Sequence, residues 1–193
     1  VQHRVFCHCA CIKQDARALQ LLPCQVACLL GYLGKLICKK DVEVSGNELQ
    51  IISGAQPTTD RDSNPNCAFR FNETTQDDYL TTTDTQFLND LEEFSVAIWF
   101  KLENTTWEEA QNVLISRDEG FDCPDRHGQW SIRLYDGNAP VFGMYNSVWD
   151  HSISDFGQWH HLVATYNIND HTIKLYRNGE LKATETGITN CSY

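Results

Sequence analysis

From residue 49 onward, short β-prone runs alternate with turn-forming residues, and this alternation restricts the fold more than any other feature of the chain. The runs are rich in Val, Ile, Phe, Tyr and Trp, and they end at Gly, Asn, Asp or Pro. No sustained helical period interrupts them. Many short strands at this spacing predict an all-β sandwich or barrel. The predicted strands are residues 49–52, 68–72, 78–82, 94–102, 112–117, 129–135, 141–145, 160–166 and 172–177.

Two of these runs are informative about position in a sheet. Residues 94–100 become apolar on both faces towards their end, which is typical of a central strand covered on each side. Residues 172–177 alternate apolar with polar side chains, and Asn178-Gly179 follows them directly. That dipeptide favours a two-residue type I′ turn, so a β-hairpin is expected here.

The order of these segments resembles the laminin-G-like and pentraxin modules of the concanavalin A-like lectin/glucanase superfamily. The likeness covers residues 50–188. Residues 54–80 look like the entry strand and first hairpin of such modules, FSVAIWFK (94–101) like the central strand, QWHHLVATY (158–166) like the most recognisable strand, and IKLYRNGEL (173–181) like the strand and turn that follow. The resemblance implies an antiparallel β-sandwich of the jelly-roll type.

The resemblance also implies places for several side chains. Trp99 and Trp159 are expected in the core, and of the neighbours His160 and His161 one is expected to point inward and the other outward. Such modules close with one or two strands beyond the position of Tyr193. Either the sandwich is truncated at its C-terminal end, or residues 49–52 and the Cys-rich segment cover an otherwise open edge.

The N-terminal segment has a different character, because six of the nine cysteines fall within the first 38 residues. We therefore divide the chain into a Cys-rich, partly helical segment, 1–44, and a sandwich domain, 45–193. The helical pattern comes from Cys24 and Cys28, which share one helix face, and this region loosely resembles the middle of an apple or PAN module. An odd number of cysteines leaves the disulfide connectivity open. The predicted disulfide residues are Cys7, Cys9, Cys11, Cys24, Cys28, Cys38, Cys67, Cys123 and Cys191.

The cluster Cys7-His8-Cys9-Ala10-Cys11 has a second interpretation as a zinc site, since thiolates and imidazoles bind zinc. Structural zinc sites usually space their cysteines by two to four residues, so disulfides are favoured over the metal.

Cysteine usage and three N-x-[ST] sequons predict a secreted, extracellular glycoprotein. The acceptor residues are Asn72, Asn104 and Asn190. Residues 19–38 are apolar but contain Pro23 and two glycines, so no membrane insertion is expected. With 26 acidic against 15 basic residues and a net charge of −11, the chain has no basic field for phosphates, which argues against a nucleic-acid partner.

Two sets of loop residues are candidate sites. Asp60, Asp62 and Asn64 place oxygen ligands at alternate positions, which suits calcium, while an Asx-capped turn explains the same residues without a metal. For ligand contact, aromatic side chains in loops stack well on sugar rings or bury in protein interfaces, and nearby acids accept hydrogen bonds from hydroxyls. The predicted ligand-binding residues are Trp107, Phe121, Tyr145, Trp149, Asp118 and Asp122.

The sequence thus predicts a calcium-assisted, lectin-like binding or adhesion module for glycans or for cell-surface and matrix proteins. A structural component of an extracellular assembly, disulfide-linked or homo-oligomeric, is the first alternative. A glycoside hydrolase is the second; it would need paired carboxylates on one strand, as in E-x-D-x-x-E, and because no predicted strand has them we expect no enzyme. The identity of the ligand is open.

Overall fold

The computed structural model describes residues 4–13, 49–52, 54–72, 79–82, 92–103, 112–117, 130–135, 138–143 and 147–187. Every helix or strand element in these residues is a β-strand, which confirms the all-β prediction. None of the described residues forms a helix with the length and apolar character needed to cross a lipid bilayer. The strands are β1 (Arg4–Lys13), β2 (Leu49–Ile52), β3 (Gln56–Thr58), β4 (Ala68–Asn72), β5 (Tyr79–Thr82), β6 (Glu93–Leu102), β7 (Asn112–Arg117), β8 (Trp130–Tyr135), β9 (Ala139–Gly143), β10 (Ser147–Trp149), β11 (Trp159–Asn167), β12 (Thr172–Arg177) and β13 (Glu180–Thr186).

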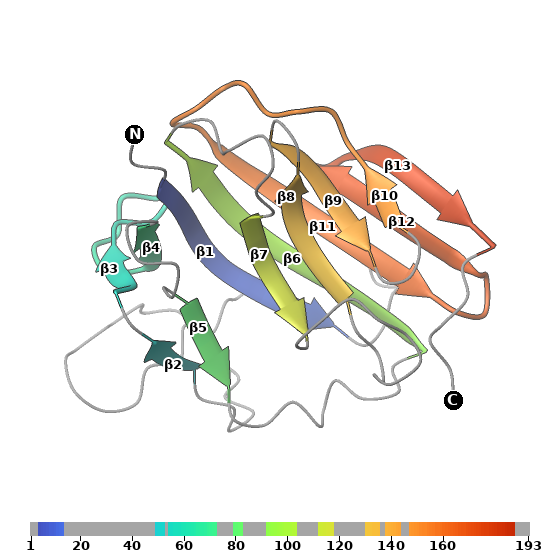
Figure 1. Ribbon diagram of the computed structural model, residues 1–193, viewed down its shortest axis with the longest axis horizontal. Coiled ribbons are helices and arrows are strands. Elements are labelled where there is room, and N and C mark those ends of the chain that lie inside the picture. Colours follow the sequence, from blue (N-terminus) through green and yellow to red (C-terminus); the bar gives the residue numbers. More distant parts are fainter. Residues whose placement is uncertain are drawn as a thin grey trace.

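The strands form two layers and a small additional pair. A seven-stranded sheet has the order β13-β12-β11-β6-β1-β4-β3, and a four-stranded sheet has the order β10-β9-β8-β7. Strands β2 and β5 pair separately. All of the strand pairs are antiparallel. In Figure 1 the four-stranded sheet lies in front of the seven-stranded sheet, so the predicted antiparallel sandwich is confirmed.

The core lies between the two sheets. Along β6, buried and half-buried side chains alternate strictly, as expected of a strand with one face on a core. Phe100 from β6 and Leu162 from β11 belong to the same buried cluster as Ile132 and Phe142 from the four-stranded sheet. Burying one such side chain stabilises the fold by about 1.5–3 kcal/mol, so this layer holds the two sheets together.

The alternation corrects one expectation about the core. Trp99 and Trp159 are half-buried on the outer face of the seven-stranded sheet, and the prediction that they lie in the core is wrong. On β6 the inward positions belong to Phe94, Val96, Ile98, Phe100 and Leu102, so a neighbouring residue such as Trp99 must face outward. Among the tryptophans that the structure describes, Trp130 lies in the core and is 3% exposed.

The prediction for the two histidines is confirmed. His160 is 3% exposed on the core side of β11, while His161 is half-buried on the outer side, where its ring stacks on Trp99.

The expected hairpin is also confirmed. Asn178 and Gly179 both have positive φ, 52° and 85°, which is the type I′ pattern, and they join Arg177 to its partner Glu180 on β13. Most predicted strands agree with the structure to within one or two residues, while 141–145 is displaced to Ala139–Gly143. The three-residue strands β3 and β10 are too short for a period to be recognised.

Part of the Cys-rich segment belongs to the main sheet. Strand β1 pairs with β4 on one side and β6 on the other, so it lies inside the seven-stranded sheet and does not cover an edge. The helical pattern around Cys24 and Cys28 lies outside the described residues. The division into 1–44 and 45–193 stays a prediction.

Candidate ligand-binding face

The side of the four-stranded sheet that faces away from the core carries a set of side chains, some of which are exposed, such as Val113 and Trp149, while others, such as Ser131 and Val141, are buried. Trp130, Ile132, Leu134, Phe142 and Val148 belong to the core, so the alternate residues of each strand point away from it. We call this outward set the front face. Its members are Val113, Ser116, Ser131, Arg133, Tyr135, Ala139, Val141, Gly143, Ser147 and Trp149.

One row of the front face crosses all four strands. Val113 pairs with Arg133, Arg133 with Val141, and Val141 with Trp149. Directly opposite residues of an antiparallel sheet have their Cβ atoms about 4.5–5.5 Å apart, so the side chains of the row are neighbours. Val141 is fully buried, whereas Trp149 at its side is 46% exposed.

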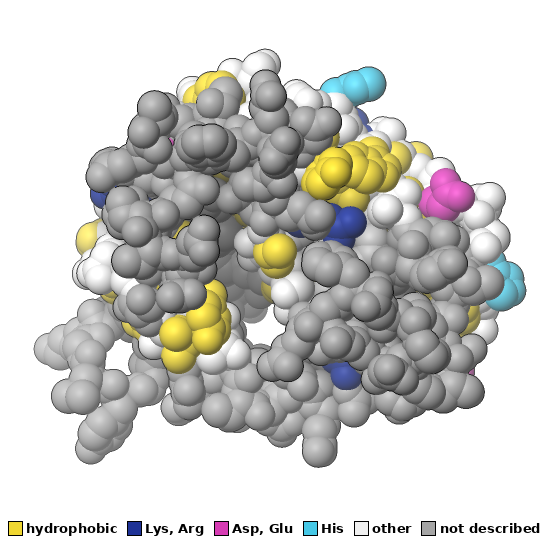
Figure 2. All heavy atoms as spheres, viewed as in Figure 1, with side chains coloured by type: hydrophobic (Ala, Val, Ile, Leu, Met, Phe, Trp, Pro, Cys, Tyr) yellow, Lys and Arg dark blue, Asp and Glu magenta, His cyan; other side chains and the backbone are white. Residues whose placement is uncertain are grey.

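Trp149 and Tyr135 form an aromatic pair on this face. Their ring centroids are 5.1 Å apart and the rings meet edge to face at 81°. This geometry suits the aromatic quadrupoles and holds the indole in one orientation while much of it stays exposed. Figure 2 looks onto this side of the molecule and shows hydrophobic side chains gathered over β9 and β10, with a basic side chain beside them.

Arg133 supplies a charge near this aromatic pair. Its Nη1 donates a hydrogen bond of 2.8 Å to Oγ of Ser131 on the same strand. Burial lowers the pKa of Arg133, and the nearby Tyr135 raises it. An arginine nevertheless stays protonated at neutral pH, so a positive charge lies on the front face.

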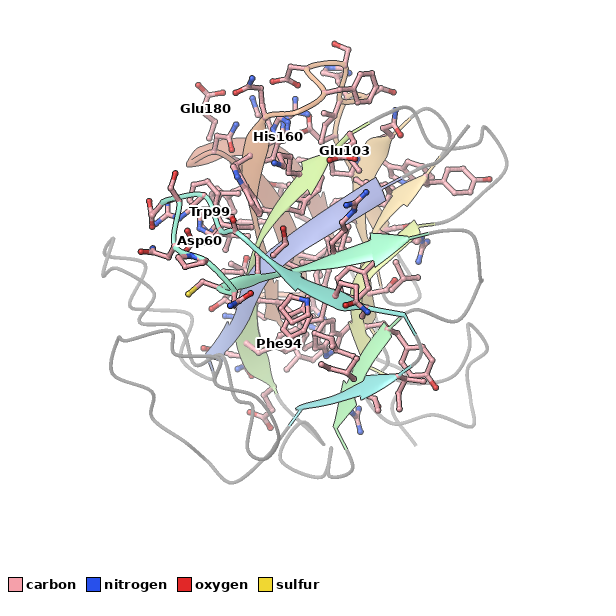
Figure 3. The ribbon with its side chains drawn as sticks, turned by 90° about the vertical axis from the view of Figure 1, so that its left-hand side faces the viewer. Asp60, Phe94, Trp99, Glu103, His160 and Glu180 are labelled. Carbon is pink, nitrogen blue, oxygen red and sulfur yellow. The ribbon has the colours of Figure 1, made fainter. Side chains whose placement is uncertain are left out.

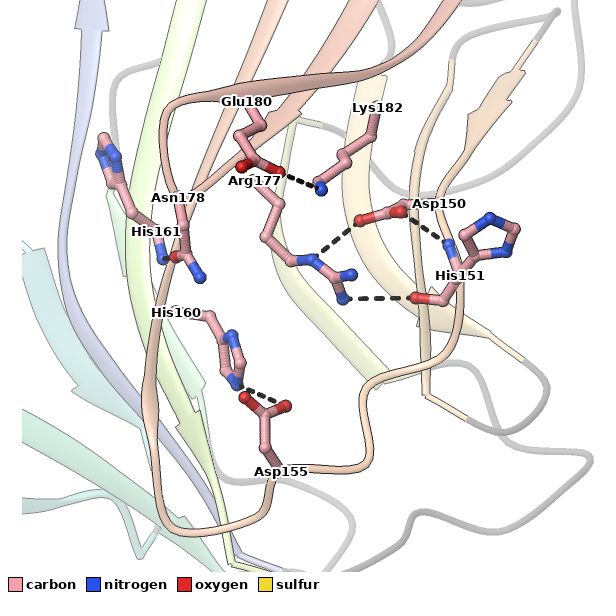
Figure 4. A network of polar contacts seen from close by, with 9 residues as sticks. All are labelled: Asp150, His151, Asp155, His160, His161, Arg177, Asn178, Glu180 and Lys182. Atoms are coloured by element: carbon pink, nitrogen blue, oxygen red, sulfur yellow. Dashed lines mark hydrogen bonds and ion pairs between the residues drawn. The ribbon is translucent and has the colours of Figure 1, made fainter.

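The chain that leaves β10 is fixed immediately after Trp149 (Figure 4). Oδ2 of Asp150 lies 2.9 Å from Nε of Arg177 on β12, and the Asp150 side chain is 2% exposed. Nη1 of Arg177 also donates to the backbone oxygen of His151 at 3.3 Å. In addition, the Asp150 amide donates to the backbone oxygen of Pro140 at 2.9 Å. These contacts join the two sheets beside Trp149 and position its backbone.

The same loop continues over a buried histidine. Nε2 of His160 lies 3.4 Å from Oδ1 of Asp155, and the His160 ring packs on Phe100 with centroids 5.5 Å apart. Burial lowers the pKa of His160, while Asp155 raises it in part and Arg177 lowers it further. Ile153, from the middle of this loop, is 2% exposed and belongs to the core, so the loop is anchored between its two ends.

The predicted calcium residues form a capped turn in the structure. Oδ1 of Asp60 accepts hydrogen bonds of 2.8 Å from the backbone amides of Asp62 and Asn64, and the Asn64 side-chain amide donates to both Asp60 oxygens. This is the Asx-turn geometry. Asp62 is exposed and lies 3.6 Å from Arg61. Within the part of the chain that the structure describes, no group of three or more His, Cys, Asp or Glu side chains is placed to hold a metal ion. Calcium binding at this turn stays a prediction.

The capped turn lies beside the outer face of the seven-stranded sheet, where Figure 3 shows Asp60 close to Trp99. The Arg61 guanidinium carbon is 4.2 Å from the centroid of the Trp99 ring, and His161 stacks on the same indole at 4.6 Å. Burial lowers the pKa of His161, and Arg61 lowers it further. A second cation lies over an indole nearby, with Nζ of Lys101 5.3 Å from the Trp159 ring.

Of the predicted ligand-binding residues, the structure describes Trp149 alone. Trp107, Asp118, Phe121, Asp122 and Tyr145 lie outside the described residues.

The glycosylation and disulfide residues are only partly described. Asn72 ends β4, and Asn104 and Asn190 lie outside the described residues. Cys67 is 4% exposed and disulfide-bonded. Cys7, Cys9 and Cys11 are positions on β1. Cys24, Cys28, Cys38, Cys123 and Cys191 lie outside the described part.

Sequence reasoning missed Arg133 and Tyr135 as members of the candidate site. A signal for them existed, because residues 129–135 were predicted as a strand in which Trp130, Ile132 and Leu134 share one face. The other face of that strand therefore had to carry Arg133 and Tyr135. The sequence pattern could not show that Trp149 on β10 lies beside Tyr135.

Comparison with known proteins agrees with the architecture. A laminin-G family model described as the Concanavalin A-like lectin/glucanases superfamily matches residues 74–192, which is more than half of the chain. No curated protein and no solved structure matches this chain. The matched residues include the four-stranded sheet with its front face and the central strands β6, β11 and β12 of the other sheet. With its two antiparallel layers and this match, the chain belongs to the concanavalin A-like lectin/glucanases superfamily.

Proposed function

We propose that this protein is an extracellular binding module that recognises a glycan on its front face, with Trp149 as the principal contact. The superfamily supports a carbohydrate- or protein-binding sandwich in general. Cysteine usage and the three sequons support the extracellular setting.

The observation that carries the proposal is the exposed aromatic pair. Trp149 is 46% exposed although it lies in a sheet beside the fully buried Val141, and Tyr135 braces it from the side. The next row of the front face consists of small residues, Ser131, Gly143 and Ser147. The indole of Trp149, braced by Tyr135, offers an exposed flat apolar surface for a sugar ring.

A glycan array followed by titration calorimetry tests the proposal. We expect the wild-type chain to bind a defined set of glycans and Trp149→Ala to weaken that binding at least about tenfold, since truncating an aromatic anchor typically costs 2 kcal/mol or more. Leu181→Ala is the matched control, because Leu181 is an exposed apolar residue, 53% exposed, on β13 of the other sheet. Equal binding by Trp149→Ala and wild type would overturn the assignment.

Further measurements separate the other interpretations. Measurements with calcium and with EDTA test the predicted calcium dependence. Non-reducing electrophoresis tests the assembly role, since a disulfide-linked polymer would migrate above the monomer. Release assays on β-glucans test the hydrolase interpretation, and we expect no sugar to be released.

A further inference from the structure

The turn between β12 and β13 carries the one Asn-Gly pair of the chain, Asn178-Gly179. Glycine has no side chain, so its backbone nitrogen can approach the side-chain amide of the preceding asparagine without steric hindrance. Both residues are exposed, and a Cβ placed on Gly179 would meet no atom within 4 Å. Solvent and open space are therefore available for a reaction between the two residues.

The reaction open to such a pair consumes only water. The backbone nitrogen of Gly179, after losing its proton to solvent, attacks Cγ of Asn178 and forms a C–N bond. The side-chain nitrogen takes up a proton and leaves as ammonia, which closes a five-membered succinimide ring. Water then opens the ring at one of its two carbonyl groups. One water is consumed and one ammonia released, no electrons are transferred, and position 178 becomes an aspartate or an isoaspartate.

Two hydrogen bonds with the backbone of His161 hold Asn178 in the turn. The Asn178 amide donates to the His161 oxygen at 2.8 Å. Oδ1 of Asn178 accepts from the His161 amide, also at 2.8 Å (Figure 4). The side chain thereby extends the ladder between β11 and β12 by one step beyond the pair of Leu162 and Arg177.

These contacts oppose the reaction in the folded chain. Attack on Cγ needs freedom of the Asn178 side chain and of the peptide plane that follows it. The hydrogen bond from His161 restrains the side chain, and the φ values of 52° and 85° belong to a type I′ turn that restrains the backbone. The attack therefore takes place when the turn opens locally, an event that costs less free energy at an exposed hairpin end than in the core.

We propose that Asn178 is a site of spontaneous deamidation whose rate is set by the opening of the β12–β13 turn. The modification adds one carboxylate to the turn, and its two products differ in their effect on the fold. Aspartate keeps an oxygen that accepts from the His161 amide. Isoaspartate puts one more methylene group into the backbone of a two-residue turn and disturbs the pairing of Arg177 with Glu180.

Peptide mapping by mass spectrometry tests the proposal on the full chain at pH 8, with a synthetic peptide of residues 173–183 as the unfolded reference. In both samples we expect Asn178 to gain the mass difference between an amino and a hydroxyl group. The full chain should react about tenfold more slowly than the peptide, because two ordinary hydrogen bonds must break first. Urea at concentrations below the unfolding transition should raise the rate in the chain towards that of the peptide.

Two further samples assign the chemistry and its consequence. A peptide with Gly179→Ala should react more slowly than the original peptide, since a Cβ hinders the attacking nitrogen. In the full chain, Asn178→Asp supplies the aspartate product by substitution and should unfold at the same urea concentration as the wild type. The isoaspartate fraction, separated by chromatography after incubation, should unfold at a lower urea concentration.

Three results would overturn the inference. An unmodified Asn178 in the full chain after complete conversion of the peptide contradicts the modification site. Equal rates in the chain and the peptide contradict the role of the turn, and so does a rate in the chain that urea leaves unchanged.

Discussion

His160 is a buried imidazole whose surroundings favour its neutral form. It faces Phe100 from β6, Asp155 from the loop after β10, and the more distant charge of Arg177 from β12. Burial is the largest effect and lowers its pKa below the ordinary value. Asp155 raises the pKa of His160 in part. Its side chain is 63% exposed, so water screens its charge.

The lowered pKa makes folding stability depend on pH. The unfolded chain, with an ordinary histidine pKa of about 6.5, takes up a proton more readily than the native state. His160 therefore makes its full contribution to the free energy of unfolding above pH 6.5. That contribution is lost as the pH falls below 6.5, by at most about 1.4 kcal/mol per pH unit. Urea unfolding at pH 7.5, 6 and 5 should show a smaller loss of stability on acidification for His160→Gln than for the wild type.

A matched control uses His151→Gln, because the His151 side chain is exposed. That variant should follow the wild-type dependence on pH. A His160→Gln profile that parallels the wild type across this range would show that His160 does not contribute.

At the scale of elements, the hairpin β12–β13 depends on its turn. Gly179 has φ +85°, a region that side chains rarely adopt, and an added Cβ would meet nothing within 4 Å. The cost of Gly179→Ala therefore comes from the backbone alone, and we expect about 1–2 kcal/mol of destabilisation in urea unfolding. Glu180→Ala, at the exposed next position, is the control and should unfold as the wild type does. Equal stability of Gly179→Ala and wild type would mean that the turn has another conformation.

The link between β10 and β12 is the second element-level feature. Arg177→Met leaves the carboxylate of Asp150, 2% exposed, without its cation, and removing one partner of such a buried pair typically costs about 3–5 kcal/mol. Glycan binding should weaken in parallel, because Asp150 follows Trp149 directly. The double variant Arg177→Met/Asp150→Asn should recover part of the stability.

Lys182→Met provides the comparison for that pair. Its partner Glu180 lies 2.6 Å away but is 75% exposed, so water screens the interaction and no measurable loss is expected. If Arg177→Met were as mild as Lys182→Met, the Asp150 contact would not anchor the loop.

At the scale of the whole molecule, one core joins the two sheets, and neighbouring residues of β11 allow a direct test. Leu162 is fully buried, whereas Val163 is half-buried on the outer face. We expect Leu162→Ala to lose about 2–5 kcal/mol of unfolding free energy. Val163→Ala should lose clearly less, and near-ultraviolet and far-ultraviolet circular dichroism should report one common transition for each variant. Similar losses at both positions would contradict the assignment of faces.

Local rules of the chain determined much of this protein. The apolar period of two marked most strands, the Asn178-Gly179 pair specified the hairpin turn, and adjacent histidines had to face opposite sides. These features depend on residues close in sequence, and their physical causes act within a few positions.

The tertiary structure decided what depends on residues far apart. Trp99 lies on the outer side of β6, because alternate side chains of a strand point to opposite faces and only one of the two apolar faces of β6 packs on the core. The tertiary structure also placed β1 between β4 and β6. The row from Arg133 to Trp149 likewise exists only through the registers of three paired strands, and register is set by the packing of the whole sheet on its core.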